Sequence, residues 1–396
     1  MILGTIGPVL KPGLLVLGLL IAVPYARGPL YHFPDPAPFA GSSFLNPYEH
    51  LRGDWQRANL HAHGRAWGGL TSGRQPNEEI VGTYRSLGYT VPGVSNYHQI
   101  AAHHGVASIP LYEHGYNIGK VHQIVIGADR VDWFDFPLWQ LLSHQQFVIH
   151  RLAETSALVA LAHPPSRRAY SPDDLRWLTG YQLLEVVNGP HRSELPWDAA
   201  LSSGRVVWAL ANDDSHDLRD PHRTGVAWNM IDAPSASTAD IVDALRAGRA
   251  YAVMRTDGVG AAADTTLTGF ELQAGTLTVA SDGEPATFLF VGQNGVVRKT
   301  VEDAHQAQYT FEAGDTYIRT VIRAPHTSMY LNPVLRYDGT RVPAPAAVVD
   351  VAGTRLLRAS IALIAVALVA IYRRRRRSPV EPTTRRVMSG ENRKTA

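Results

Sequence analysis

The 396-residue chain contains no cysteine. This absence excludes a disulfide framework and every zinc site built on thiolates. Any metal that the protein binds must be held by nitrogen and oxygen ligands, a donor set that suits Zn, Mn or Fe. The absence of cysteine does not decide the compartment. We also find no internal repeat along the chain.

A strong charge of one sign is absent from most of the chain. Residues 373–396 carry nine Lys/Arg and two Asp/Glu, a net charge of +7, whereas the whole chain carries only +2. The part before residue 373 therefore has a net charge of −5. A slightly acidic region argues against non-specific nucleic-acid binding, so no nucleic-acid partner is expected. The basic tail is expected to attract anionic lipid.

Long apolar runs occur only at the two ends. Residues 356–372 are apolar apart from Arg358 and Ser360, and five arginines follow directly. We predict a transmembrane helix over 355–372, at the short end of the usual length, and a cytoplasmic basic tail over 373–396. The alternative is a buried core helix that runs into a basic tail.

The second apolar run, residues 13–25, follows Lys11. It has the character of a transmembrane helix or of the apolar part of a signal peptide. Because no Ala-x-Ala cleavage site follows it, we predict an uncleaved N-terminal transmembrane helix or signal anchor over 1–27. Either alternative places residues 28–354 outside the cell membrane, so the expected location is the membrane with an extracytoplasmic catalytic domain.

Between the ends, the sequence patterns divide the chain into three parts. Residues 28–54, rich in Pro, Phe and Tyr, are a linker. Residues 55–260 alternate helix signals (78–87, 145–157, 171–180, 238–247) with strand signals (123–128, 158–163, 183–188, 206–211), which indicates βα units and a mainly parallel sheet. Residues 261–342 change to period two, with strand signals at 267–279, 287–291 and 317–322 and a hairpin turn at Asn294-Gly295, which predicts a small all-β sandwich.

Thirteen of the seventeen histidines lie between residues 61 and 222. His61 and His63 are spaced i, i+2 at the end of a strand-like run, so their side chains share a face in extended chain. The same spacing recurs at Asn96 and His98. A third pair, Asp214 and His216, also ends a strand-like run.

Three further ligand-type residues lie between these pairs: Glu113, His122 and His163. Ligand-type side chains at successive strand ends are what a metal site at a barrel mouth requires.

This ordered set resembles the polymerase and histidinol phosphatase (PHP) family over residues 55–255, about half of the chain. The resemblance implies an α/β fold, a distorted (β/α)7 TIM-like barrel with two or three divalent ions at the C-terminal ends of its strands. It assigns metal ligation to His61, His63, Asn96, His98, Glu113, His122, His163, Asp214 and His216. The second motif departs from the family, which has adjacent Asp and His where this chain has Ser95-Asn96-Tyr97-His98.

The resemblance and the ligand chemistry together predict a metal-dependent hydrolase, a phosphoesterase acting outside the membrane. Arg65 and Arg192 are candidates for holding the substrate phosphate, with Lys120 as a further contact, and His216 or His98 for protonating the leaving oxygen. Glu185 is expected to support the ligands. The expected partner is a phosphoester-containing small molecule or envelope component.

The alternative is a non-catalytic surface protein with a metal-stabilised PHP scaffold and a ligand-binding sandwich.

Overall fold

The computed structural model describes residues 7–101, 109–256 and 265–377. By its contacts the chain forms two compact units, Met1–Asp350 and Val351–Ala396. The predicted tail from residue 378 onward lies outside the described residues, as do the first six residues of the predicted N-terminal helix.

The helices of the first unit begin and end largely where local signals place them. They are α1 (Gly7–Arg27), α2 (Asn77–Ser86), α3 (Leu142–Ala153), α4 (Pro172–Trp177), α5 (Glu194–Ser202) and α6 (Thr238–Ala247). The helix predicted over 238–247 is confirmed: Ser237 caps its N-terminus, and Gly248 ends it with a left-handed φ of 76°. The helix predicted over 171–180 is shorter, because Leu178 turns to an extended ψ of 144°.

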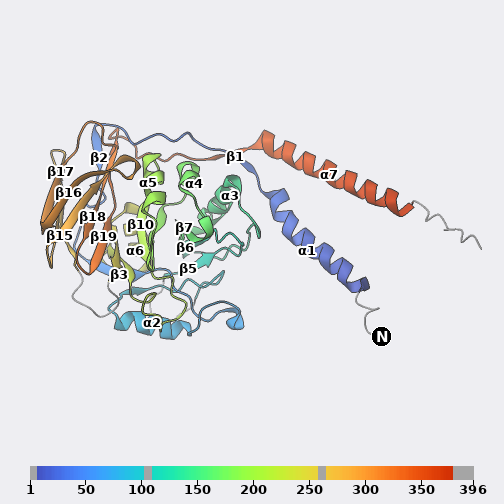
Figure 1. The fold of residues 1–396 in the computed structure, drawn as a ribbon, viewed down its shortest axis with the longest axis horizontal. Coiled ribbons are helices and arrows are strands. Elements are labelled where there is room, and N and C mark those ends of the chain that lie inside the picture. The colour runs from blue at the N-terminus through green and yellow to red at the C-terminus, as the bar shows by residue number, and fades with distance from the viewer. Residues whose placement is uncertain (1–6, 102–108, 257–264, 378–396) are drawn as a thin grey trace, which may run out of the picture. The chain divides into compact units, whose positions relative to one another are not determined.

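One sheet of the first unit carries most of the strands predicted between residues 123 and 211. Its members are β5 (Leu111–His114), β6 (Gln123–Ala128), β7 (Ser156–Leu161), β8 (Leu183–Asn188), β9 (His191–Arg192) and β10 (Trp208–Asn212). The strand order is β10-β8-β7-β6-β5, with β9 paired to β8. Helix α3 packs on β7, α5 on β8, and α6 on β6 and β7, as Figure 1 lets the reader follow.

A second, ten-stranded sheet joins the segments on the two sides of residue 260. It contains β2 (Ser43–Leu45), β3 (Trp55–Asn59), β4 (Val91–Pro92), β11 (Ala227–Asp232), β12 (Ala250–Arg255), β15 (Ala286–Val291), β16 (Val297–Ala304), β18 (Tyr317–Arg323), β19 (Thr327–Leu331) and β20 (Val334–Tyr337). Strand β12 pairs with β19, so the sheet continues from the predicted barrel segment into the predicted sandwich segment. The proposed domain boundary near residue 260 stays a prediction.

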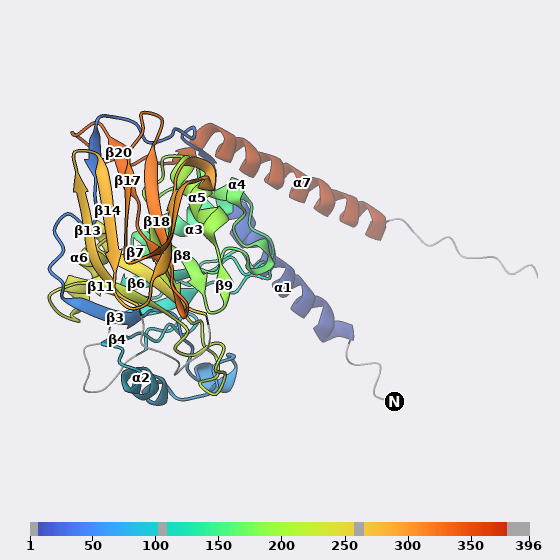
Figure 2. The same ribbon diagram turned by 60° about the vertical axis from the view of Figure 1, so that its left-hand side comes forward.

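Two small sheets complete the first unit. One is formed by β13 (Leu267–Gln273), β14 (Thr276–Ser281) and β17 (Gln306–Thr310); the other pairs β1 (Leu30–His32) with β21 (Val348–Asp350). Strand β17 packs on β15 and β16, and Figure 2 shows these C-terminal strands gathered together. The β14 and β17 side chains alternate between buried and more exposed positions, the period-two pattern of the sequence.

The predicted distorted TIM-like barrel is not shown, because the sheets are separate and not closed. The structure is a mixed α/β arrangement with several separate sheets. Contrary to the prediction of a mainly parallel sheet, β5–β6 and β6–β7 are antiparallel. The pairs β7–β8 and β8–β10 in this sheet are parallel, as is β3–β4 in the ten-stranded sheet. Between the two large sheets, isolated bridges join Ala62 to Ser215 and Tyr97 to Glu113.

In the second unit, the described residues form one helix, α7 (Val351–Arg377). Its segment Val351–Arg374 is long and apolar enough to cross a membrane, and it is the one such helix among the described residues. The helix continues past Tyr372, where the predicted span ends, through the arginine run. In the first unit, α1 is 21 residues long, and Val16–Arg27 is its apolar part among the residues whose side chains the structure describes.

Candidate metal centre

Main-chain hydrogen bonds hold two predicted ligand motifs side by side. His61 and His63 follow β3, and Asp214 and His216 follow β10. The N–H of His63 donates to the carbonyl of Ser215 at 2.8 Å, and the N–H of Asp214 donates to the carbonyl of His61 at 2.9 Å. The two motifs therefore approach each other as neighbouring strands do, with their alternate side chains on one side.

Glu113, in β5, is the centre of the remaining predicted ligands. Its Oε1 lies 2.7 Å from His122 Nδ1, 3.1 Å from His163 Nε2 and 3.5 Å from His61 Nε2. Its Oε2 lies 3.1 Å from His63 Nε2. One carboxylate thus contacts four imidazoles from three segments: the one after β3, the one before β6 and the one after β7.

Asp214 supplies a second carboxylate to the same place. Its Oδ1 lies 3.2 Å from His61 Nε2, 3.3 Å from His63 Nε2 and 3.5 Å from His216 Nδ1. The Nε2 atoms of His61 and His63 are 3.1 Å apart. The structure therefore brings together seven of the nine predicted ligands, here called the central cluster: His61, His63, Glu113, His122, His163, Asp214 and His216.

A buried glutamate on β8 fixes the orientation of His61. Glu185 Oε1 accepts a hydrogen bond from His61 Nδ1 at 2.8 Å, and its Oε2 accepts from the main-chain N–H of His163 at 2.8 Å. With Nδ1 as the donor to Glu185, the ring of His61 would present an Nε2 lone pair to the central cluster once a bound cation displaces the proton from Nε2. This is the supporting role expected for Glu185.

The buried charges of the central cluster perturb one another. Burial opposes protonation of His61, but the charges of Asp214, Glu185 and Glu113 together raise its pKa well above the usual value. Burial likewise opposes ionisation of Glu113, yet His122 and His61 hold its pKa well below the usual value. The pKa of Asp214 is lowered in the same way, mainly by His61. Both carboxylates are therefore ionised, and they concentrate negative charge where a cation would be favoured.

The donor set fits a divalent cation. Two groups have ligand atoms that all lie within 4.8 Å of one another: His61, His63 and Asp214, and His61, Glu113 and His163. Glu113 Oε2 and Asp214 Oδ1 are buried and accept no hydrogen bond from the part of the chain that the structure describes. Such oxygens are costly to bury unless a cation or donor satisfies them. Imidazole and carboxylate ligands are compatible with Zn, Mn or Fe.

The backbone is strained at the same place. His163, Asp214 and Lys120 have positive φ values of 30°, 51° and 59°. Residues with side chains rarely adopt this left-handed region, and such strain concentrates at functional sites.

A pocket of about 260 Å³ opens beside the central cluster. His163, Asp214 and His216 form part of its wall, together with the cations Lys120 and Arg223. Arg223 Nη1 lies 3.3 Å from Asn188 Oδ1 and 4.0 Å from Asp214 Oδ2. The pocket therefore combines the metal-ligand set with positive side chains that suit an anionic substrate.

Asn96 was expected as an oxygen ligand, but the structure does not bring it into the central cluster. Its Oδ1 accepts a hydrogen bond from the N–H of Gly64 at 2.7 Å, and its Nδ2 donates to Asn77 Oδ1 at 3.1 Å. The carboxamide thus connects the loop after His63 to the start of α2. Because Asn77 Oδ1 accepts from Asn96, it does not cap the N-terminus of α2, which begins at Asn77.

His98 was expected as a ligand or acid, and it also lies outside the central cluster. Its Nδ1 lies 3.1 Å from the carbonyl of Asp132, and its Nε2 accepts from the N–H of Gly115 at 3.0 Å. The ring stacks on Trp133 with a centroid distance of 5.0 Å. Burial, and then the neighbouring His114, lower the pKa of His98 to about 3. Both ring nitrogens are occupied by structural contacts.

Tyr97, the residue between these two, is the one that reaches the pocket. Its ring stacks on His63 at 4.6 Å between centroids and meets His122 edge-on at 5.6 Å. Burial, and then the charges of Glu113 and Asp214, raise the pKa of its phenol, which stays protonated. Tyr97 was not among the residues predicted from the sequence, although it directly follows Asn96, at the place where the resembled family has a histidine.

The two predicted phosphate-binding arginines are not in this pocket. Arg65 is exposed and does not line it, and Arg192 lies in a neighbouring pocket with its Nε 3.3 Å from Met254 Sδ. Lys120, expected as a further contact, does line the pocket, and the arginine that does so is Arg223. Arg223 lies seven residues after His216, in the loop that leaves the last motif, and no local pattern distinguishes it from Arg65.

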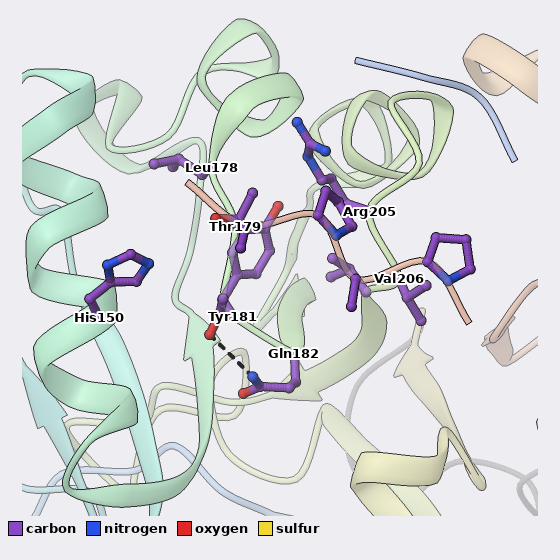
Figure 3. Close-up of a pocket in the computed structure, with 13 residues that line it drawn as sticks. His150, Leu178, Thr179, Tyr181, Gln182, Arg205 and Val206 are labelled. Atoms are coloured by element: carbon purple, nitrogen blue, oxygen red, sulfur yellow. Dashed lines mark hydrogen bonds between the residues drawn. The ribbon is translucent and has the colours of Figure 1, made fainter. Parts of the chain in front are cut away.

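A different hollow of about 350 Å³ contains none of the predicted ligands. Figure 3 shows its lining, which includes His150, Thr179, Tyr181, Arg205 and the segment 343–346. The N–H of Ala347 donates to Thr179 Oγ1 at 2.9 Å. The segment 343–347 therefore packs against the rest of the first unit along this hollow.

Comparisons with known proteins identify no family for this chain. No family model matches it, and no curated protein matches it. A solved structure that does match is a two-domain protein containing a predicted PHP-like metal-dependent phosphoesterase from Bacteroides vulgatus. It is 12% identical, covers 74% of this chain and 94% of its own, and superimposes with a TM-score of 0.40. At this TM-score the likeness supports neither fold nor function, and the site has to be argued from its own residues.

Proposed function

We propose that this protein is a metal-dependent hydrolase that cleaves phosphoesters. The observation that carries the proposal is the convergence of Glu113 and Asp214, both ionised, with four buried imidazoles at 2.7–3.5 Å. A structural ion pair would leave these oxygens hydrogen-bonded, whereas Glu113 Oε2 and Asp214 Oδ1 accept no hydrogen bond from the described residues.

The residues of the central cluster would hold two divalent ions. Because Nδ1 of His61 donates to Glu185, His61 has only Nε2 to offer and would ligate one of the two ions, and the other would be held by the remaining members of the cluster. When bound, such ions supply Lewis acidity toward a phosphoryl oxygen. Glu185 orients His61 for this purpose, and the strained backbone at His163 and Asp214 keeps these ligands directed at one point.

The remaining pocket residues would bind and orient the substrate. Lys120 and Arg223 would neutralise the charge of the phosphoryl group. His216, whose Nδ1 lies 2.9 Å from the main-chain carbonyl of Asp214, has Nε2 as its proton acceptor and is the residue we assign to proton transfer. Tyr97, protonated and stacked on His63, would donate a hydrogen bond to the substrate.

We also propose that the two large sheets form a distorted barrel of the PHP kind around this centre. The isolated bridges Ala62–Ser215 and Tyr97–Glu113 support this arrangement, since they connect the strand ends that carry the ligands.

The test is metal analysis of the purified full-length chain, together with hydrolysis of 4-nitrophenyl phosphate and bis(4-nitrophenyl) phosphate. We expect two ions per chain and turnover that a chelator removes and added Mn²⁺ or Zn²⁺ restores. Less than one ion per chain would overturn the proposal.

A second candidate is a non-catalytic surface protein that uses the metal centre only as a scaffold. It is favoured by one observation, the replacement of the adjacent Asp and His of the resembled family by Asn96 and Tyr97. Stoichiometric metal without turnover on either ester would support this candidate over the hydrolase.

We further propose that the first unit faces outward, toward an envelope component or a small phosphoester. The arginine run at the end of α7 supports a cytoplasmic C-terminus. Because the chain has no cysteine, single cysteines test this cleanly. Ser86→Cys, at an exposed position, should react with a membrane-impermeant maleimide on intact cells, and Ser378→Cys should react only after lysis.

A further inference from the structure

A larger pocket adjoins the pocket of the central cluster. Its volume is about 700 Å³, compared with about 260 Å³ for the cluster pocket. Pro165 lines both pockets. Successive residues of the segment 191–194 also face the two pockets in turn: His191 and Ser193 line the cluster pocket, and Arg192 and Glu194 line the larger one.

Most of the wall of this larger pocket is apolar. It includes Leu195, which is 72% exposed, and Tyr170, which is buried, as well as four prolines. The phenol of Tyr170 lies 3.4 Å from the main-chain carbonyl of His122, so this wall reaches back to a member of the central cluster. A leucine with this exposure beside prolines is an apolar surface without a partner in the described residues.

Two of the three charged side chains of the wall are cationic. Arg168 and Arg192 line the pocket, and neither forms an ion pair within residues 7–101, 109–256 and 265–377. Glu194, the carboxylate of the wall, is already paired, with its Oε2 3.1 Å from Arg319 Nη2. The wall therefore presents apolar area and unpaired positive charge together.

The backbone around Arg168 is in a strained conformation. Arg167 and Arg168 both have positive φ values, 47° and 57°, in the turn that follows the His163 segment. Arg167 Nη1 donates to the carbonyl of Ile118 at 3.0 Å, which directs the first arginine away. A strained turn that presents the second arginine to a pocket is consistent with a binding role.

We infer that the larger pocket binds the alcohol portion of the substrate, and that this portion is an apolar body bearing a second anionic group. The inference rests on the proposed function, because it assigns the phosphoryl group to the pocket of the central cluster. The apolar body packs against Leu195, Tyr170 and the prolines, and the anionic group pairs with Arg168 and Arg192.

Non-hydrolysable phosphonates test this without relying on turnover. The Mn²⁺-loaded full-length chain is titrated calorimetrically with methylphosphonate, 2-naphthylmethylphosphonate and a carboxylated 2-naphthylmethylphosphonate. The naphthyl ring should tighten binding at least about tenfold over methylphosphonate, as burial of a ring-sized apolar group does. The carboxylate should tighten binding by a further factor of about five to ten.

Two variants and one control assign the effects to residues. Leu195→Asp should remove the gain from the naphthyl ring, and Arg192→Gln should remove most of the gain from the carboxylate. Leu70→Asp is the matched control, because Leu70 is 91% exposed and lines neither pocket, and it should leave all three affinities unchanged.

The outcomes separate this inference from the proposed function. Equal affinity for methyl and naphthyl phosphonates, or a naphthyl gain that survives Leu195→Asp, would overturn it even if chromogenic esters are hydrolysed. The expected pattern in a protein that hydrolyses no ester would support the pocket assignment and leave the hydrolase proposal refuted. A carboxylate gain that Arg192→Gln leaves intact would overturn the anionic part.

Discussion

Two groups of buried histidines lie near each other in this protein, and they differ in the partners of their ring nitrogens. In the central cluster, the imidazoles of His61, His63 and His163 face carboxylates and one another, and two carboxylate oxygens have no hydrogen bond among the described residues. In the other group, His98 and His114 pack with ring centroids 4.8 Å apart. Every nitrogen of these two rings has a neutral partner.

The difference shows that burial does not distinguish a ligand from a structural histidine. His98, His114 and His61 are all at most 4% exposed. What distinguishes them is the set of partners of the ring nitrogens. His98 donates from Nδ1 and accepts at Nε2, and both nitrogens of His114 face neutral oxygens, whereas Nε2 of His61 faces two carboxylates and another imidazole. The variants below alter one group while the other serves as the reference.

The largest effect is expected from His61→Ala. This substitution removes the ligand common to both candidate metal groups, so we expect bound metal to fall and turnover to drop by more than about 100-fold, beyond the loss typical of a supporting residue. Metal analysis and ester hydrolysis measure both. His114→Gln in the other group should retain stoichiometric metal; loss of metal there as well would mean that the two groups are not distinct.

A smaller effect is expected from Glu185→Gln, which leaves all direct ligands in place. The amide cannot hold His61 Nδ1–H as the carboxylate does at 2.8 Å, so metal affinity should fall by about 10- to 100-fold. Competition with a chelator measures it. The matched control is Gln123→Ala, which removes the acceptor of His114 Nδ1 and should leave metal affinity unchanged.

Seven of the nine predicted ligands come together in the structure because the pattern that selected them is local. Alternation places His61 and His63 on one face, and the same rule places Asp214 and His216. It failed at Asn96 and His98 because β4 is only two residues long, Val91–Pro92, and His98 has a positive φ of 47°. Beyond the end of a strand, i and i+2 no longer share a face, and Tyr97 takes the inward position.

The prediction of a mainly parallel sheet was wrong, and the spacing of two strands in the sequence already indicates why. Strands β5 and β6 are separated by residues 115–122, too few for the crossover that a parallel pair requires. This spacing favours a hairpin, and the pair is antiparallel. Arg223 could not be preferred over Arg65 in advance, because which loop arginine enters a pocket depends on long-range packing that no local pattern encodes.

The structural group offers a pH test. Protonation of His98 would break the hydrogen bond from Gly115 N–H to Nε2, and its pKa in the folded chain is lowered to about 3. A histidine pKa lowered by folding contributes stability above the unfolded pKa of about 6.5, and this is lost as the pH falls toward 3. Between pH 6.5 and 5 the loss is about 2 kcal/mol.

Urea unfolding at both pH values, with wild type and His98→Gln, measures this loss. The variant has no titrating ring, so its free energy of unfolding should fall by about 2 kcal/mol less than that of the wild type over this interval. Equal losses in both proteins would contradict the neutral assignment of His98.

Tyr97→Phe tests the residue that occupies the inward position. The phenyl ring keeps the stacking on His63, so metal content should be unchanged, whereas the hydrogen bond of the phenol to substrate is lost. We expect kcat/KM to fall by about 2- to 10-fold, as loss of one hydrogen bond does. Steady-state kinetics measure this; a loss of metal would instead make Tyr97 a ligand.

The smallest effect is expected from Asn96→Asp, the change that restores the carboxylate of the resembled family. The Oδ1 of Asn96 already accepts from the N–H of Gly64, and an aspartate in this rotamer would do the same while losing the donation to Asn77 Oδ1. The new charge would therefore remain at the base of the loop, on the side where Asn96 now contacts α2. We expect no additional metal ion per chain, turnover within about twofold of wild type, and a stability loss of about 1 kcal/mol for the broken amide contact. A third ion in metal analysis would show instead that the side chain of residue 96 can turn into the central cluster. Residue 96 would then count as a ligand, and His98 would be the first structural residue after it.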